Sequence, residues 1–181
     1  MDLGDFKIWR DNMNENLPQR KHPRLDKWDS QAGSYFITIC ADNRKCLFST
    51  VGRGLAPAEE NNTAVYVELS QYGKILEVEL KNITNRYPYV VIDKYVIMPD
   101  YNHFIMTLSA GASPRPTVMD IICAYKSIAT RRCKQMGYNE KRLFQTSFFE
   151  HIIRNHDDYR ETVNYIRQNP VNWLHDNLYS E

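Results

Sequence analysis

The stretch VIMPDYNHFIMTL, residues 96–108, decides the fold of this chain because it joins two apolar segments through a tight turn. The segments VVIDKYVIM (90–98) and NHFIMTL (102–108) are rich in β-branched and aromatic residues, which favour strands. Pro99–Asp100 links them directly. The stretch therefore predicts two neighbouring strands joined by a tight link.

Tyr101 and His103 stand where the second of these strands begins. Polar groups in a buried strand cost about 1–3 kcal/mol each unless they are satisfied. Alternate residues of a strand project to the same face, so both side chains point into one site. Two histidines at this spacing would anchor a divalent metal, whereas a phenol ligates poorly. A structural histidine satisfied by its neighbours is the alternative interpretation.

Further strands and helices are expected on both sides of this pair. Strands are predicted at 34–41, 64–69 and 148–154, with 44–52 as a second limb of the first strand and 53–62 as a loop. Helices are predicted from 70 to about 83, from 117 to 137, and from Asp157 or Asp158 to about Asn169. Thr117 and Asp120 form an N-cap pattern, Gly137 ends that helix, and Pro170 ends the last one.

The order of these elements is strand, helix, strand, strand, helix, strand, helix. A βαββαβ core with a terminal helix predicts an α+β, ferredoxin-like antiparallel sheet with helices on one face and an additional C-terminal helix. Residues 1–30 are polar and end in a basic cluster, so we expect an N-terminal arm before a domain over 31–181.

Bulk composition narrows the classes of function. Hydrophobic residues make up 43% of the chain and charged residues 25%, with a net charge of +1, so nucleic-acid binding must rest on local patches. The four cysteines form no CxxC pair, which argues against a zinc knuckle or a disulfide scaffold. Without a membrane-length apolar run or a signal sequence, we expect a soluble cytoplasmic protein with no membrane partner.

Tyr165 and Asn169 lie four residues apart on the last predicted helix, so they share one face of it. The apolar stripe of this helix is Tyr159, Val163 and Ile166, and Tyr165 lies more than about 100° from its centre. A tyrosine that only filled the core would lie on the stripe, so this one faces a second surface. A purely structural role, with Asn169 as a helix cap, stays open.

A basic and hydroxyl-bearing helix face follows from YKSIATRRCK, residues 125–134. No Glu stands at i±4 to pair its cations, which favours contact with phosphate. A solvated helix face is the alternative. The cations are Lys126, Arg131, Arg132 and Lys134, with Lys141, Arg142 and Arg154 further along the chain.

Several linked motifs resemble those of the single-tyrosine HUH transposases, particularly the REP-associated tyrosine transposases. They are RKHPRLDKWDSQAGSYFITIC (20–40), YVIMP (95–99), YKSIATRR (125–132), FQTSFFEHIIRN (144–155) and YIRQNPVNW (165–173). The resemblance covers most of the chain, in order and with similar spacing, and it implies a ferredoxin-like fold.

The resemblance also implies a chemistry. In this family a tyrosine hydroxyl attacks a DNA phosphodiester and forms a 5′-phosphotyrosine link, while Mg²⁺ or Mn²⁺ polarises the phosphate. By position, Tyr165 would be the nucleophile, Asn169 the third metal ligand and His103 the second histidine. The first histidine position holds Tyr101.

This chain departs from the family pattern at the metal site. Besides Tyr101, Asn102 replaces the usual hydrophobic residue, and Asp100 stands where the family has Asn. Losing one of three protein ligands should weaken metal binding, so we expect DNA nicking to be impaired or lost. In a regular strand Asp100 and Asn102 point to the other face, and only a β-bulge could recruit one of them.

The partner implied by the resemblance is single-stranded or hairpin DNA, bound through the basic residues and through Arg24 of the arm, with no small-molecule substrate. A homodimer is possible, and the sequence does not say whether Tyr165 acts in cis or in trans. Two alternatives remain: a domesticated module that binds nucleic acid without cleaving it, and a regulatory or structural domain without nucleic-acid function.

Overall fold

The structure, a computed structural model, describes residues 32–55, 63–111 and 115–175. The expected basic arm, with Arg24, lies outside the described residues, and so does the expected domain boundary at residue 30. In the described part of the chain, no helix is both long and apolar enough to cross a membrane.

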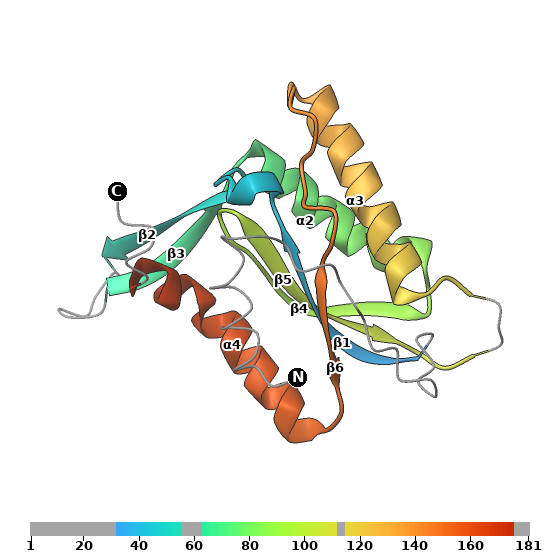
Figure 1. The fold of residues 1–181 in the computed structure, drawn as a ribbon. Helices are drawn as coiled ribbons and strands as arrows, with labels where there is room; N and C mark the ends of the chain where they lie inside the picture. Colours follow the sequence, from blue (N-terminus) through green and yellow to red (C-terminus); the bar gives the residue numbers. More distant parts are fainter. Residues whose placement is uncertain (1–31, 56–62, 112–114, 176–181) are drawn as a thin grey trace. The chain divides into compact units, whose positions relative to one another are not determined.

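A four-stranded antiparallel sheet forms the centre of the fold (Figure 1). Its strands are β1 (Gly33–Cys40), β4 (Val90–Ile97), β5 (Tyr101–Leu108) and β6 (Phe149–Ile153), in the order β4-β5-β1-β6. All neighbouring strands are antiparallel. The order places the two strands that follow the helices at the edges, which is the ferredoxin-like topology that the sequence predicts.

The deciding stretch forms the hairpin β4–β5, as expected. Ile97 lies opposite Asn102, and the backbone N–H of Met98 donates to the carbonyl of Tyr101 at 2.8 Å, which closes the tight link. A β-bulge interrupts β4 between Ile92 and Tyr95, where β4 has one residue more than β5.

A second, two-stranded sheet consists of β2 (Ser49–Leu55) and β3 (Thr63–Leu69). The expectation that 44–52 continues the first strand is therefore wrong, because β2 pairs with β3 instead. A short 3-10 turn, η2 (Asp42–Arg44), redirects the chain after β1, with Asn43 and Arg44 at φ of 53° and 55°. The expected loop at 53–62 also begins later, since its first residues belong to β2.

Among the described residues, three helices complete the fold: α2 (Gln71–Arg86), α3 (Val118–Gln135) and α4 (His156–His175). The Ser70 hydroxyl accepts a hydrogen bond from the N–H of Gly73 at the start of α2. Thr117 and Asp120 form a complete capping box on α3. Both helix starts are predictable because the signals are local.

The helices cover opposite faces of the sheet (Figure 1). Residues such as Ile37 and Phe104 form one apolar core with Leu76 of α2 and Ile121 of α3. Neighbouring side chains on the strands, such as Phe36, point the other way and contact α4. The two core helices thus share one face, as expected, and the additional C-terminal helix covers the other.

The predicted end of α4 at Asn169 is wrong, because the helix continues through Pro170 to His175. Proline removes one backbone donor but does not forbid helix. The side-chain amide of Asn169 donates to the carbonyl of Tyr165 at 3.2 Å, and the ring of Trp173 packs on Tyr101 at 5.9 Å. These contacts on both sides of Pro170 hold the final turns in place.

Candidate functional site

Four residues that the sequence singles out meet between β5 and α4. The Tyr101 hydroxyl donates to Oδ1 of Asn169 at 2.5 Å, and the rings of His103 and Tyr165 lie 5.5 Å apart. Tyr101 and His103 are 2% and 1% exposed, so the cluster is enclosed on its sheet side. The period of two along β5 and the spacing of four along α4 bring these side chains together.

His103 is fixed from several directions. Its Nδ1 lies 2.8 Å from the hydroxyl of Thr38, the residue opposite it on β1. The rings of Tyr101 and Phe36 lie 4.5 Å and 5.1 Å from its own. The histidine is therefore held in one orientation.

Tyr165 is half-buried, whereas its neighbour Ile166 on the apolar stripe is buried. Its ring meets Phe36 edge to face, with centroids 5.9 Å apart at an interplanar angle of 88°. The offset predicted from the helical wheel thus places Tyr165 beside His103 at the margin of the α4–sheet interface.

The donor set does not fit Mg²⁺ or Mn²⁺. These ions favour carboxylate, carbonyl and water oxygens, and an imidazole where geometry allows. Here the described residues of the cluster supply one imidazole, and Oδ1 of Asn169 already accepts the hydrogen bond of Tyr101. Within the described ranges, no three His, Cys, Asp or Glu residues are grouped to hold a metal ion.

Asp100 and Asn102, which differ from the family pattern beside Tyr101, do not supply the missing metal ligand. Asn102 points to the other face of the sheet, where its side-chain amide donates to the hydroxyl of Tyr125 at 2.9 Å. Asp100 forms an ion pair with Arg44, Oδ2 to Nε at 2.6 Å. The bulge that could have re-aimed a ligand lies in β4, not in β5.

Arg44 is a site residue that sequence reasoning missed. Its guanidinium lies 5.2 Å from the ring centre of Tyr101, and its Nη1 lies 3.0 Å from Sγ of Cys40. Burial raises the pKa of the Cys40 thiol to about 11, against the opposing effect of Arg44, so the thiol stays protonated. The residue in the sequence that could have pointed to Arg44 is Asp100, because a buried carboxylate requires a cation beside it.

The basic residues of α3 lie on the other face of the sheet from Tyr165. Lys126 donates to the carbonyls of Gln145 and Thr146 at 2.5 Å and 3.0 Å, so its ammonium tethers the segment before β6. Arg131 and Lys134 are exposed. The structure thus does not bring the predicted cations of α3 and the tyrosine together.

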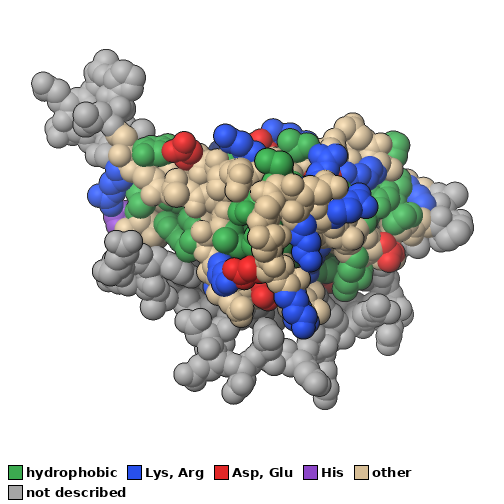
Figure 2. Space-filling model, turned by 90° about the horizontal axis from the view of Figure 1, so that it is seen from above, with side chains coloured by type: hydrophobic (Ala, Val, Ile, Leu, Met, Phe, Trp, Pro, Cys, Tyr) green, Lys and Arg blue, Asp and Glu red, His purple; other side chains and the backbone are tan. Residues whose placement is uncertain are grey.

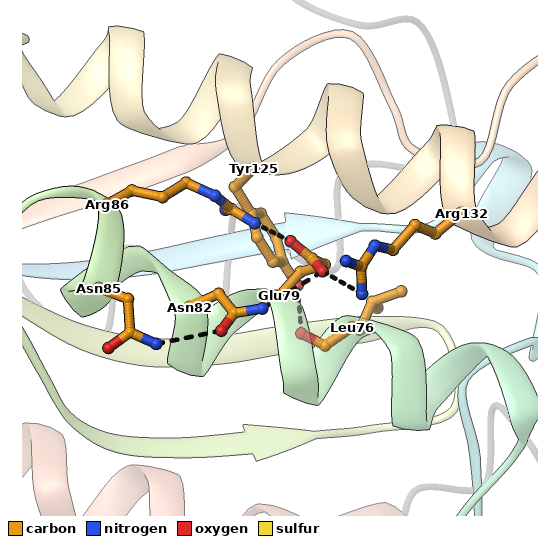
Figure 3. Close-up of polar contacts among 7 residues, drawn as sticks. All are labelled: Leu76, Glu79, Asn82, Asn85, Arg86, Tyr125 and Arg132. Carbon is orange, nitrogen blue, oxygen red and sulfur yellow. Dashed lines mark hydrogen bonds and ion pairs between the residues drawn. The ribbon is translucent and has the colours of Figure 1, made fainter.

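Arg132 has an acidic partner that the sequence pattern could not show. Its Nη1 lies 2.7 Å from Glu79 of α2, a fully buried carboxylate that also pairs with Arg86 (Figure 3). The expectation of an unpaired cationic face is therefore wrong at Arg132, because the partner comes from the neighbouring helix and not from i±4.

The remaining cations are spread over the surface. Arg154, just after β6, is exposed, and its backbone N–H donates to Asp158 at 3.0 Å. Viewed from above the fold of Figure 1, Lys and Arg side chains form several groups with acidic side chains among them (Figure 2). Positive charge on this face is therefore confined to separate groups of side chains, in keeping with a net charge of +1 for the chain.

The sequence of this chain resembles those of known proteins. No family model matches the chain. An uncharacterised protein of Haemophilus influenzae is 28% identical over 185 residues, which cover 92% of this chain and 96% of that protein. The REP-associated tyrosine transposase of Escherichia coli K12 is 35% identical over 80 residues, 44% of each chain.

The solved structure of a REP-associated tyrosine transposase bound to a REP hairpin superposes with a TM-score of 0.60. The match covers 87% of this chain and 74% of that one, at 22% identity. The resemblance inferred from the motifs is thus confirmed: this chain has the fold of the REP-associated tyrosine transposases and shares sequence with one of them over part of its length.

Proposed function

We propose that this chain is a DNA-binding protein of the transposase family that binds single-stranded or hairpin DNA, and that its nicking activity is impaired or lost. One observation carries the second part: the hydroxyl of Tyr101 is bonded to Asn169 at the place where the family would hold its metal. The phenol supplies a hydrogen bond there in place of a metal ligand.

Impaired nicking follows from the charge that the reaction requires. Attack on a phosphodiester places additional negative charge on the phosphate oxygens, and a preorganised cation is the usual means of stabilising it. Among the residues that the structure describes, the cluster around Tyr165 contains one imidazole, that of His103, and a Tyr–Asn hydrogen bond. In this proposal Tyr165 occupies the nucleophile's position without a metal ion beside it, and the guanidinium of Arg44 next to Tyr101 is already paired with Asp100.

DNA binding is supported by the fold and by exposed cations. The structural neighbour was solved with a hairpin. In this chain Arg131, Lys134 and Arg154 are exposed and available for phosphate contacts. The arm of residues 1–30, with Arg24, is proposed as a further DNA contact ahead of the domain.

A cleavage assay tests the loss of nicking. Wild type, Tyr165→Phe and Tyr101→His are incubated with hairpin DNA that carries a single-stranded extension, in the presence of Mn²⁺. We expect wild type to bind the DNA and to cleave no more than Tyr165→Phe. Normal turnover by wild type, abolished only in Tyr165→Phe, would contradict the proposal.

The second candidate is a domesticated binding module in which Tyr165 never forms a covalent link. The edge-to-face contact of Tyr165 with Phe36 favours it, because a half-buried aromatic ring also suits stacking on a base. The Tyr101→His variant separates the two. Metal-dependent cleavage by this variant indicates a decayed enzyme, whereas binding without cleavage indicates the module.

A further inference from the structure

The outward face of α4 carries a stripe of exposed side chains. Its members follow one another at intervals of three or four residues, which places them on one side of the helix: Arg160, Asn164, Arg167 and Val171. The buried residues of α4, among them Ile166, lie on the side that packs on the sheet. The stripe therefore belongs to the surface of the molecule and takes no part in its core.

Both arginines of the stripe keep their guanidinium groups free of protein contacts. Within the described residues, no group forms a hydrogen bond or an ion pair with the guanidinium of Arg160 or Arg167. Asp157 is the only acid that stands three or four residues from either arginine in the sequence. Glu161 stands four residues before Tyr165 and lies on that other side of the helix. The N–H groups of both arginines are thus available to a ligand.

The acid that β4 presents to α4 is already engaged. Asp93, at the bulge of β4, lies 2.8 Å from Nζ of Lys94 and accepts a hydrogen bond from the hydroxyl of Tyr159 on α4. These hydrogen bonds with Asp93 raise the pKa values of Lys94 and Tyr159, and the positive charge of Arg167 acts against both shifts. Arg167 therefore lies near a second cation, on the margin of α4 that faces β4.

The charge and spacing of the stripe complement a DNA backbone. Arg160 and Arg167 are seven residues apart on one helix, which separates their backbones by about 10 Å. A DNA strand carries one phosphate about every 3.4 Å along the duplex axis, so the two arginines span about three nucleotides. A guanidinium matches two phosphate oxygens, and the amide of Asn164 between the arginines is a further donor to phosphate.

We propose that Arg160 and Arg167 bind backbone phosphates of DNA along the outward face of α4, the helix that also carries Tyr165. The inference rests on the proposed DNA-binding function and adds a binding surface to it. This surface is separate from the cations of α3, because α3 and α4 cover opposite faces of the sheet (Figure 1). Phosphates occur in every hairpin stem, so the contact does not require a single-stranded extension.

The test measures the affinity of the full chain for a hairpin, with and without a single-stranded extension, at several salt concentrations in EDTA. The variant is Arg160→Gln/Arg167→Gln, whose melting temperature should equal that of wild type because both positions are exposed. We expect it to bind both hairpins about tenfold more weakly. The slope of log K against log salt should fall by about 2, since each lost phosphate contact contributes about 0.9.

Lys74→Gln/Lys81→Gln is the matched control for the loss of two charges. These lysines are also seven residues apart and exposed, but they lie on α2, on the other face of the sheet. We expect this variant to lower the slope by less than half as much as the arginine variant. An arginine variant that loses no more affinity than this control overturns the inference, and the outward face of α4 then has a different partner or none.

A variant that keeps the charge gives a second measurement. Arg160→Lys/Arg167→Lys should retain the salt slope of wild type, because the release of counterions depends on the number of charges at the phosphates. A slope as low as that of the glutamine variant would overturn the inference, since the effect would then not come from phosphate contacts. A wild type that binds neither hairpin overturns the proposed function itself.

Discussion

Tyr101 links the sheet to α4 through the hydrogen bond that its hydroxyl donates to Asn169 and through the ring contact with Trp173. Tyr101→Phe keeps the ring contacts but removes the donor from a buried carboxamide oxygen. We expect it to lower the free energy of unfolding by about 1–3 kcal/mol, measured by urea denaturation. Tyr66→Phe is the control, because Tyr66 is 49% exposed. Equal stability of the two variants would show that the bond contributes nothing.

Lys126 is expected to act on stability more than on DNA binding. Its ammonium donates to the carbonyls of Gln145 and Thr146. Lys126→Met should cost about 1–3 kcal/mol in urea denaturation, because these acceptors lose a charged donor. Lys134→Met, at an exposed position of the same helix, should leave stability unchanged. If Lys134→Met lowered stability more than Lys126→Met, the contacts of Lys126 with the two carbonyls would not contribute to stability.

Residue positions were predictable where the geometry is local. The period of two along a strand placed Tyr101 and His103 on one face, and the spacing of four placed Tyr165 with Asn169. The partnership of Arg44 with Asp100 was not predictable in this way. It joins residues far apart in sequence, and the 3-10 turn η2 places Arg44 at a positive φ, which is rare for arginine and has no signal in the sequence.

At the scale of elements, Asp158 joins the first turn of α4 to β6. Asp158 bonds Nε2 of His151 on β6 at 2.8 Å and accepts the N–H of Arg154. Burial works to raise the pKa of Asp158, but these hydrogen bonds outweigh it and leave the pKa below its usual value. The charged carboxylate therefore stabilises the folded chain above the ordinary aspartate pKa of about 3.9.

This stabilisation should be lost as pH falls through the lowered pKa of Asp158. We expect Asp158→Asn to be less stable than wild type at pH 6 and to approach it in stability at a pH below the ordinary aspartate pKa of about 3.9. Thermal unfolding at both pH values measures the difference. A constant gap between the two proteins over this range would show that the carboxylate charge plays no part.

The end of α4 shows where element prediction fails. Pro170 disfavours helix in the residue before it, and by local rules alone the helix should stop at Asn169. The contact of Trp173 with Tyr101 lies beyond this proline. Tertiary packing therefore overrides a local signal, while the caps at Ser70 and Thr117, which depend on neighbours in sequence, are correct.

At the scale of the whole molecule, Mn²⁺ should not stabilise the wild-type chain. A ligand that binds the folded state raises the melting temperature by an amount that grows with the logarithm of its concentration relative to its dissociation constant. The Tyr101–Asn169 donor set does not suit this ion. We expect no shift for wild type in a thermal melt with Mn²⁺. A rise of several degrees that His103→Ala abolishes would contradict this.

DNA binding should depend steeply on salt because phosphate contacts release counterions. Each contact contributes about 0.9 to the slope of log K against log salt, so Arg131→Gln/Lys134→Gln should lower the slope by about 2. Lys81→Gln is the control, since Lys81 lies on α2 and pairs with Glu77. An unchanged slope in the double variant would show that this part of α3 makes no contact with DNA phosphates.

The bulge in β4 has a consequence for how the molecule behaves at high concentration. The strand order leaves β4 and β6 at the edges of the sheet, where unpaired backbone groups could template a strand from another molecule. β4 carries Asp93 and Lys94 at its bulge, and β6 is only 5 residues long. Irregular, charged and short edges are poor templates, so the fold itself guards against aggregation by strand addition.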